Sequence, residues 1–187
     1  MKDQEKCVES YSRIKNLKLV GIELGIPWQT VYVHLQRAGV SVAGDKLRYG
    51  SDTDRLAAAG EQLFRKLVPI AVDKNMEQFQ AKVDFEVRGH LVDVKTSTLR
   101  SSNKACKKKR WAFCIKKQER IADFLVCFGL GNSHDLVATL LIPCEISRRY
   151  TTIGLGEALS GKWADYLIDP SDLCEFFCSI PQKQKAA

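Results

Sequence analysis

Long apolar segments are absent from this sequence of 187 residues. The longest apolar run, residues 136–143, is far shorter than the roughly 20 residues that a membrane-spanning helix needs. The charged start MKDQEK is followed by no apolar region, so we expect no secretory signal peptide. These absences predict a cytoplasmic protein that has no membrane partner.

Paired cysteine motifs are absent as well. The seven cysteines are an odd number and none stands in a C-x-x-C pair, which argues against a disulfide framework. Cys174 and Cys178 are four residues apart on a predicted helix, but two further ligands are missing nearby, so a zinc site is not indicated. We therefore expect reduced thiols, buried where they lie within apolar runs.

Acidic residues are the scarcer charged type: 22 Asp and Glu against 29 Lys and Arg give a net charge of +7. This excess favours a polyanionic partner, nucleic acid before a membrane surface, although it does not define a fold. The hydrophobic fraction of 45% and the charged fraction of 27% are typical of a soluble globular protein. The length suffices for one sizeable core, or for one domain with a small appendage.

Residues 1–41 are predicted to form a small helical domain. Apolar residues recur at helical spacing from residue 3 onward, and a second short helix, Leu17–Leu24, is expected to end at Gly25. Pro27 suits the first turn of a third helix that runs to about Ala38. A polar linker over residues 42–51 follows.

Residues 52–187 are predicted to form an α/β domain in which helices flank a mixed central sheet. A capping signal at residues 51–54 opens a helix that continues to Leu67. Strands are expected at 79–87, 90–98, 111–115, 124–128 and 136–142, and the last two are apolar enough to be central. Residues 99–110 are expected to form a basic loop or a short helix, and helices are expected at 156–168 and 172–178.

The segment VDFEVRGHLVDVKTST, residues 83–98, concentrates charges on one face of a predicted hairpin. If Arg88-Gly89 is a two-residue turn, Asp84 faces Asp93 across the strands and Lys95 shares their face. Two opposed aspartates repel, and a divalent cation such as magnesium or manganese would compensate for that repulsion. Lys95 could then stabilise an anionic phosphate or orient a water molecule. The alternative is a solvated hairpin face with cross-strand salt bridges.

Asp84 followed by Asp93-Val94-Lys95 resembles the D…(D/E)-x-K signature of the PD-(D/E)XK nucleases, which have the restriction-endonuclease-like fold. The resemblance covers about residues 52–145, and Val83 stands where the name-giving proline would stand. A preceding helix that carries an acid, here Glu61, is similar to Holliday-junction resolvases and some homing endonucleases.

The resemblance implies a metal-dependent endonuclease that hydrolyses phosphodiester bonds in DNA. Asp84 and Asp93 would be ligands of Mg²⁺ or Mn²⁺, Glu61 a supporting ligand and Lys95 the catalytic lysine. Two further residues are alternative members of this site under the same resemblance: Glu86 and Gln118.

The segment GIELGIPWQTVYVHL, residues 21–35, looks like a helix-turn-helix. Gly21 would let two helices approach, Gly25 would make the turn, and Val31 and Leu35 would pack the second helix on the first. In such modules the outward side of the second helix enters the major groove of DNA. That side would carry Trp28, Gln29, Tyr32, Gln36 and Arg37. A three-helix module used for dimerisation is the alternative.

The densest basic run follows the charged hairpin, and we expect it to bind DNA phosphates without reading sequence. Its members are Lys104, Lys107, Lys108, Lys109 and Arg110. A merely solvated loop is the alternative for this run.

The sequence thus supports two classes of function. The first is a PD-(D/E)XK endonuclease with an N-terminal helix-turn-helix, for which a homodimer would suit double-strand cutting. The second is a non-catalytic DNA-binding protein or regulator on a nuclease-like scaffold. Completeness of the four-residue site favours the enzyme.

Overall fold

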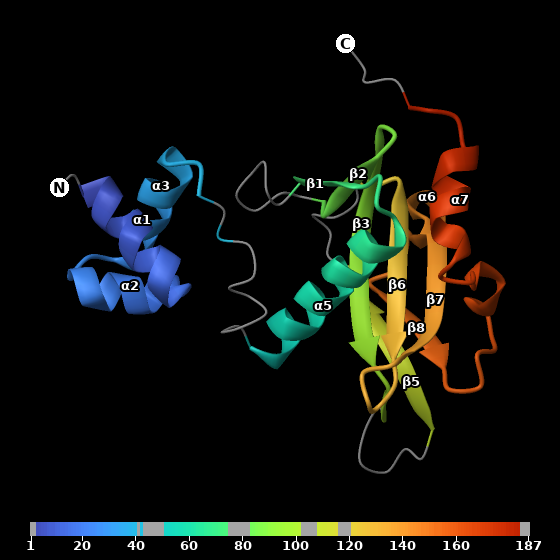
Figure 1. The fold of residues 1–187 in the computed structure, drawn as a ribbon. Coiled ribbons are helices and arrows are strands. Elements are labelled where there is room, and N and C mark those ends of the chain that lie inside the picture. The colour runs from blue at the N-terminus through green and yellow to red at the C-terminus, as the bar shows by residue number, and fades with distance from the viewer. Residues whose placement is uncertain are drawn as a thin grey trace. The chain divides into compact units, whose positions relative to one another are not determined.

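The computed structural model describes residues 3–40, 42, 51–74, 83–101, 108–115 and 121–183. The chain divides into two units, Met1–Ala58 and Ala59–Ala187, and each is described by itself (Figure 1). The boundary falls inside helix α5, Asp52–Leu67, and most of the predicted linker lies outside the described residues. No described helix combines the length and apolar character that crossing a membrane requires.

Residues 3–40 of the first unit form three short helices, and all three lie where the sequence predicts them. They are α1 (Asp3–Ile14), α2 (Leu17–Leu24) and α3 (Trp28–Arg37). The α2 helix begins after Asn16, whose side chain accepts a hydrogen bond of 3.1 Å from the backbone N–H of Leu19. It ends at Gly25, which adopts the left-handed conformation with φ 67° that favours glycine.

Gly21 sets the close approach of α2 to the segment that leads into α3. A Cβ atom at Gly21 would lie 2.7 Å from the carbonyl oxygen of Ile26 and 3.2 Å from the backbone nitrogen of Trp28, so no larger residue fits without a shift. The core beneath is formed by fully or almost fully buried side chains: Cys7, Tyr11, Val20, Val31 and Leu35. The predicted packing of Val31 and Leu35 is therefore confirmed.

The second unit is built on a five-stranded mixed sheet with the order β1-β2-β3-β6-β7. Its strands are β1 (Val72–Asp73), β2 (Phe85–Val87), β3 (His90–Thr98), β6 (Phe124–Leu130) and β7 (Leu136–Pro143). Only β3 and β6 pair in parallel, and the other neighbours are antiparallel. An α/β fold with a mixed sheet flanked by helices is thereby confirmed.

A second, three-stranded antiparallel sheet has the order β4-β5-β8. Its strands are β4 (Arg100–Ser101), β5 (Lys109–Cys114) and β8 (Thr152–Gly156). The remaining elements are α6 (Cys144–Ser147), the 3-10 helix η3 (Ala164–Tyr166) and α7 (Asp172–Ser179).

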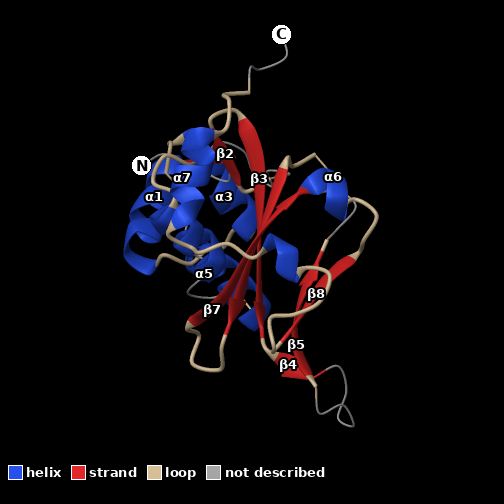
Figure 2. Ribbon diagram, turned by 90° about the vertical axis from the view of Figure 1, so that its right-hand side faces the viewer, coloured by secondary structure: helices blue, strands red, loops and turns tan. Residues whose placement is uncertain are grey.

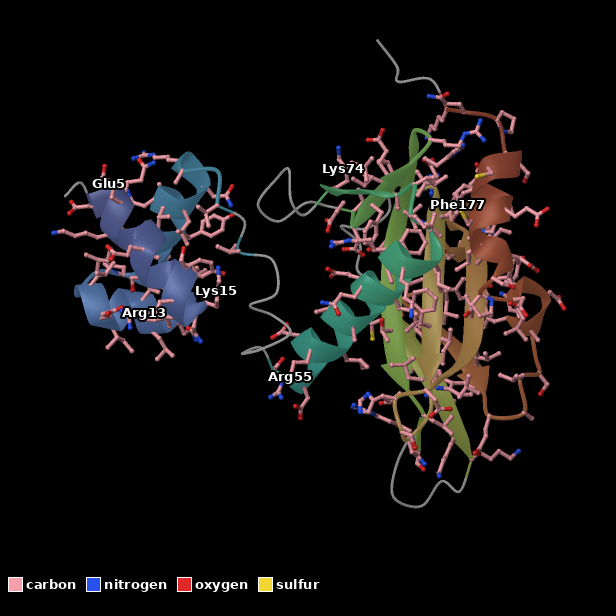
Figure 3. The ribbon with its side chains drawn as sticks, viewed as in Figure 1. Glu5, Arg13, Lys15, Arg55, Lys74 and Phe177 are labelled. Carbon is pink, nitrogen blue, oxygen red and sulfur yellow. The ribbon has the colours of Figure 1, made fainter. Side chains whose placement is uncertain are left out.

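The five-stranded sheet lies between two layers, with α5 and α7 on one side and the smaller sheet on the other (Figure 2). On the helical side Phe64 of α5 packs against Phe85, with ring centroids 4.9 Å apart, and Phe177 of α7 meets Phe124 at 5.7 Å (Figure 3). On the other side the indole N–H of Trp111 donates a hydrogen bond of 2.8 Å to the carbonyl oxygen of Leu130. Both faces of the central strands are consequently covered.

Three sequence predictions are corrected here. Residues 156–168 do not form a helix, because Thr152–Gly156 is strand β8 and turns lead from it to η3. Lys109 and Arg110, expected in a loop, begin strand β5. Strand β7 is the last in its sheet rather than central, and its apolar residues stay covered because the chain after η3 bonds to it through Ile168 N–H and Thr139 O at 3.0 Å.

Gly60 provides a test of how α5 meets β3, since an added Cβ would lie 1.7 Å from Thr96 Oγ1. Gly60→Ala should lower the free energy of unfolding by about 2 kcal/mol, because overpacking outweighs the gain in helix propensity. Thr96→Ala removes the clashing atom and should restore at least about 1 kcal/mol in the double variant, measured by urea unfolding.

Gly156→Ala is the matched control, because nothing lies within 4 Å of a Cβ added there. Equal effects of the Gly60 and Gly156 substitutions would contradict the packing of α5 on β3.

Candidate functional site

The charged hairpin is closed by the predicted two-residue turn. Arg88 and Gly89 have φ values of 49° and 84°, and a type I′ turn needs positive φ at both central residues. Val87 pairs with His90, as the turn predicts, and Phe85 pairs with Val92. The C-terminal segment packs on this turn, where Lys183 N–H donates to the carbonyl oxygen of Arg88 at 3.0 Å.

The paired register of the hairpin ends at Phe85 and Val92, one residue short of Asp84. The backbone N–H of Asp84 donates to the carbonyl oxygen of Val92 at 3.2 Å. The Asp84 carboxylate accepts a hydrogen bond of 2.8 Å from the backbone N–H of Val94. Asp84 is half-buried, and its side chain is therefore fixed on the strand that carries Asp93 and Lys95.

Asp93 and Lys95 form a buried ion pair on β3. The ammonium nitrogen of Lys95 lies 3.0 Å from Oδ1 and 2.9 Å from Oδ2 of Asp93. Only 5% of the Asp93 side chain and 19% of the Lys95 side chain are exposed. The ammonium group therefore neutralises a carboxylate that is almost inaccessible to water. The alternative prediction, a solvated hairpin face, does not account for this burial.

Further charges complete this face of the sheet. Lys74, which follows β1, pairs with Glu86 at 3.4 Å, and Figure 3 marks Lys74 beside this edge. Asp123, just before β6, accepts a hydrogen bond of 2.9 Å from the backbone N–H of Leu91 and pairs with Lys183 at 2.6 Å. Sequence periodicity could not predict that Lys74 and Asp123 belong to this cluster of charges, because only tertiary contacts bring them to the hairpin.

Two thiols lie near the buried pair. Cys127 stands beside Lys95 on β6, and burial followed by the negative charge of Asp93 raises the pKa of the Cys127 thiol well above its usual range. Burial, with a contribution from Asp93, raises the pKa of Cys144 to about 11. Both shifts disfavour the thiolate form of these two cysteines.

Glu61 is placed on α5, directly after the Gly60 that contacts Thr96. Thr96 alternates with Lys95 along β3, so it lies on the opposite face of the sheet. Among the residues that the structure describes, no three His, Cys, Asp or Glu side chains are arranged to hold a metal ion. Glu61 as a supporting ligand remains a prediction, and Gln118 lies outside the described ranges.

The donor type of the two aspartates is nevertheless compatible with magnesium or manganese. Asp84 and Asp93 each offer hard oxygen donors, and Mg²⁺ commonly takes one or two carboxylates together with waters and substrate phosphates. Lys95 now supplies the positive charge beside Asp93, so a bound cation would compete with the lysine for that carboxylate.

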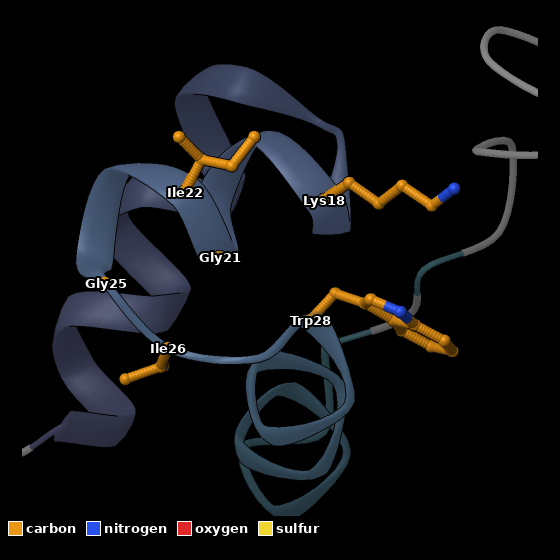
Figure 4. Close-up of a pocket in the computed structure, with 6 residues that line it drawn as sticks. All are labelled: Lys18, Gly21, Ile22, Gly25, Ile26 and Trp28. Atoms are coloured by element: carbon orange, nitrogen blue, oxygen red, sulfur yellow. The ribbon is translucent and has the colours of Figure 1, made fainter.

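The helix α3 presents most of the predicted DNA-binding side chains to solvent. Gln29, Gln36 and Arg37 are exposed, Trp28 is 37% exposed, and Tyr32 is half-buried, which raises the pKa of its hydroxyl. A depression between α2 and α3 lies beside them (Figure 4). Its lining is mostly apolar, with one cation: Lys18, Gly21, Ile22, Gly25, Ile26 and Trp28.

Part of the predicted phosphate-binding run can be located. Lys108, Lys109 and Arg110 are exposed at the start of β5. Lys104 and Lys107 lie outside the described residues.

Comparison with known proteins gives no family. No family model matches the chain, and no curated protein is similar enough to count as a relative. The function must therefore be argued from the geometry of the chain itself.

The buried pair makes a thermodynamic prediction. Lys95→Met and Asp93→Asn should each lower the free energy of unfolding by about 3 kcal/mol, because each leaves a buried charge without its partner. The double variant should lose less than the sum of the two, measured by urea unfolding at pH 7 without divalent ions.

The control cycle is Lys74→Met with Glu86→Gln, in which the acid is more exposed, at 18%. The coupling free energy between Lys74 and Glu86 in this cycle should stay below about 1 kcal/mol. Additive single losses at Asp93 and Lys95 would show that the two charges do not stabilise each other.

Proposed function

We propose that this protein is a metal-dependent DNA endonuclease of the PD-(D/E)XK type. One observation carries the proposal: the Asp84 carboxylate is hydrogen-bonded to the strand that carries Asp93 and Lys95, and the lysine contacts Asp93. This arrangement supports the D…(D/E)-x-K resemblance. The mixed sheet with α5 before the hairpin is compatible with a restriction-endonuclease-like fold.

The reaction would add water across one phosphodiester P–O bond. The oxygen of the water becomes a phosphate oxygen, and the leaving oxygen takes a proton. Asp84 and Asp93 would hold Mg²⁺ or Mn²⁺, which when bound lowers the pKa of a water molecule and offsets negative charge on the phosphate. Glu61, predicted as a supporting ligand, stands on α5 next to the Gly60 that packs on the opposite face of the sheet, so the proposal depends on the two aspartates and not on Glu61.

Lys95 has a separate role in this proposal. Released from Asp93, its ammonium group can donate to a non-bridging phosphate oxygen and stabilise the negative charge that develops there. A charge in a site this far removed from water acts more strongly than one in bulk solvent. The low exposure of the Asp93–Lys95 pair therefore supports the assignment.

DNA is the proposed substrate because the net charge is +7 and basic side chains are exposed in both units. In the first unit α3 would enter the major groove as the second helix of a helix-turn-helix. The close approach at Gly21 and the exposure of Gln29, Gln36 and Arg37 support this role. A homodimer would allow both strands of a duplex to be cut.

A non-catalytic DNA-binding regulator is the second candidate. The observation that favours it is the pairing of acids with lysines on the hairpin face, Asp93 with Lys95 and Glu86 with Lys74. Such pairing could be purely structural, and a direct assay separates the two functions.

The catalytic prediction is that the protein cleaves DNA with Mg²⁺ or Mn²⁺, and not with Ca²⁺ or with chelator. Asp93→Asn should abolish cleavage, and Lys95→Ala should slow it by roughly three orders of magnitude, since transition-state charge loses its partner. The assay uses linear duplex, single-stranded and four-way-junction DNA. Asp172→Asn, an exposed acid on α7, is the control and should cleave at the wild-type rate.

Metal binding provides a readout besides activity. Asp93→Asn should lose Mn²⁺ binding in calorimetric titration, whereas Lys95→Ala should retain it, because the lysine competes with the cation. Cleavage by Asp93→Asn at the wild-type rate would point to another site or a contaminant. DNA binding without cleavage of any substrate would favour the regulator.

The recognition prediction concerns α3. Gln29→Ala should relax the preference of the protein for particular duplexes, since one bidentate base contact contributes about 1–3 kcal/mol of discrimination. The measurement is selection from a random duplex library in chelator, followed by binding of the enriched sequences. Glu9→Gln, an exposed substitution on α1, should leave the preference intact. An unchanged preference in Gln29→Ala would argue for a dimerisation module.

A further inference from the structure

The outer face of the three-stranded sheet is the most unusual surface of the second unit. Trp111 and Phe113 of β5 are almost fully buried, and the indole of Trp111 packs on Gly129, where an added Cβ would lie 3.1 Å from the ring. Because side chains alternate along a strand, the residues between and beside these aromatics must face outward. The outer face is formed by Arg100, Arg110, Ala112, Cys114, Thr152 and Gly154.

Two arginines stand directly opposite each other on this face. Arg100 of β4 pairs in register with Arg110 of β5. Like charges directly opposite on antiparallel strands destabilise the pair. Within the described part of the chain neither arginine forms an ion pair, and Arg100 bonds only to the hydroxyl of Thr98, at 2.9 Å. The fold thus keeps a repulsive cationic pair that has no internal counter-charge among these residues.

Beyond the two arginines, the described residues of this face are small and none is acidic. Ala112 pairs with Gly154 and Cys114 pairs with Thr152, so the side chains beyond the arginines are small. A Cβ at Gly154 would meet only the Cδ of Arg110, at 3.9 Å, so packing inside the protein does not require a glycine here. A strand glycine without an internal reason is typical of a place where another molecule approaches the backbone closely.

We propose that this outer face binds the phosphate backbone of DNA, with Arg100 and Arg110 contacting phosphate oxygens. Two guanidinium groups side by side suit the repeating charges of a polyanion, and the bound phosphates would relieve their repulsion. Lys109 at the rim of the sheet adds a further exposed cation, while Glu157, just after β8, is the acid nearest in sequence. The proposal relies on the proposed function for the choice of DNA as the polyanion.

A second copy of the chain fits this face less well. A symmetric dimer would set the same patch against itself, so four arginines would meet. Ser97, Lys95 and Asp93 alternate on the face of β3 that looks toward the smaller sheet, and Ser97 Oγ accepts a hydrogen bond of 3.1 Å from Ala112 N–H. DNA held on the outer face would thus lie on the same side of the five-stranded sheet as the candidate active site.

The first experiment compares two double variants that each remove two positive charges. Arg100→Gln/Arg110→Gln should weaken binding of a labelled 20-bp duplex at least tenfold and lower the slope of log K against log salt by about 2, since each phosphate contact contributes roughly 0.9. Binding is followed by fluorescence anisotropy in chelator. Arg55→Gln/Lys66→Gln, on exposed positions of α5, should leave the slope unchanged.

The charge variant should fold normally, because removing opposed like charges keeps or raises the Tm. Equal slope changes in both double variants would reduce the effect to net charge and overturn the proposal. Gly154→Thr is a second test. The Tm of this variant should stay the same or rise, because threonine favours strands. Its DNA binding should weaken, because the added side chain projects from the outer face. Unaltered DNA binding in Gly154→Thr would also count against close approach of a backbone.

The alkylation rate of Cys114 measures the accessibility of the outer face of the smaller sheet. Cys178 on α7 is the internal control, since both thiols are exposed. The reactions use a Cys106→Ser background, because Cys106 lies outside the described residues. Saturating duplex should slow alkylation of Cys114 by N-ethylmaleimide about fivefold or more and leave Cys178 unaffected, as accessibility controls thiol reactivity. Equal rates with and without DNA would overturn the proposal.

Self-association is the remaining outcome. Protection of Cys114 that grows with protein concentration in the absence of DNA, together with a doubled molar mass, would make the face a contact between copies. Because every arm is run in chelator, the result does not depend on cleavage. Protection of Cys114 in a protein that cuts no DNA would remove the nuclease proposal alone, and cleavage with Cys114 unprotected would remove this proposal alone.

Discussion

The ion pair of Asp93 with Lys95 constrains the register of strand β3. Asp93 is 3% exposed on a strand whose two faces are both covered, and an unpaired carboxylate there would cost several kcal/mol. Lys95 can neutralise it because residues two apart in a strand share a face. A register slip of one residue would turn both charges into the phenylalanine cluster under α5 and α7, so the pair and the cluster together fix the register of β3.

Local patterns were sufficient where neighbours in the sequence are neighbours in space. The α1, α2 and α3 helices, α5, β3 and the Arg88-Gly89 turn follow from capping, periodicity and turn chemistry that act within a few residues. Strand β8 was missed because its sequence TIGLG is short and contains Gly154 and Gly156, which weaken a strand, although Ile153 and Leu155 alternate and are fully buried. Long-range pairing with β5 forms that strand, and local propensity does not.

The candidate site divides in the same way. Asp93 and Lys95 could be predicted to meet because residues two apart in a strand share a face. Asp84 lies just beyond the paired register that the two-residue turn fixes. Asp123 and Lys183 reach the hairpin from distant parts of the chain, so no local pattern could indicate them. The position of Arg100 opposite Arg110 could not be predicted from the sequence either. It depends on β4, a strand of only two residues that follows β3.

Strand β5 links the candidate active site to the basic outer face. Ser97 lies on the Asp93 face of β3 and accepts the hydrogen bond of Ala112, while Trp111 is anchored on Leu130. Because of these contacts the side chains of Arg110 and Cys114 point outward. The same contacts hold the smaller sheet against the face of the five-stranded sheet that carries Asp93. The helices α5 and α7 cover the other side. The smaller sheet therefore covers the face of β3 that carries Asp93, and its outer face, with the two arginines, points away from the five-stranded sheet.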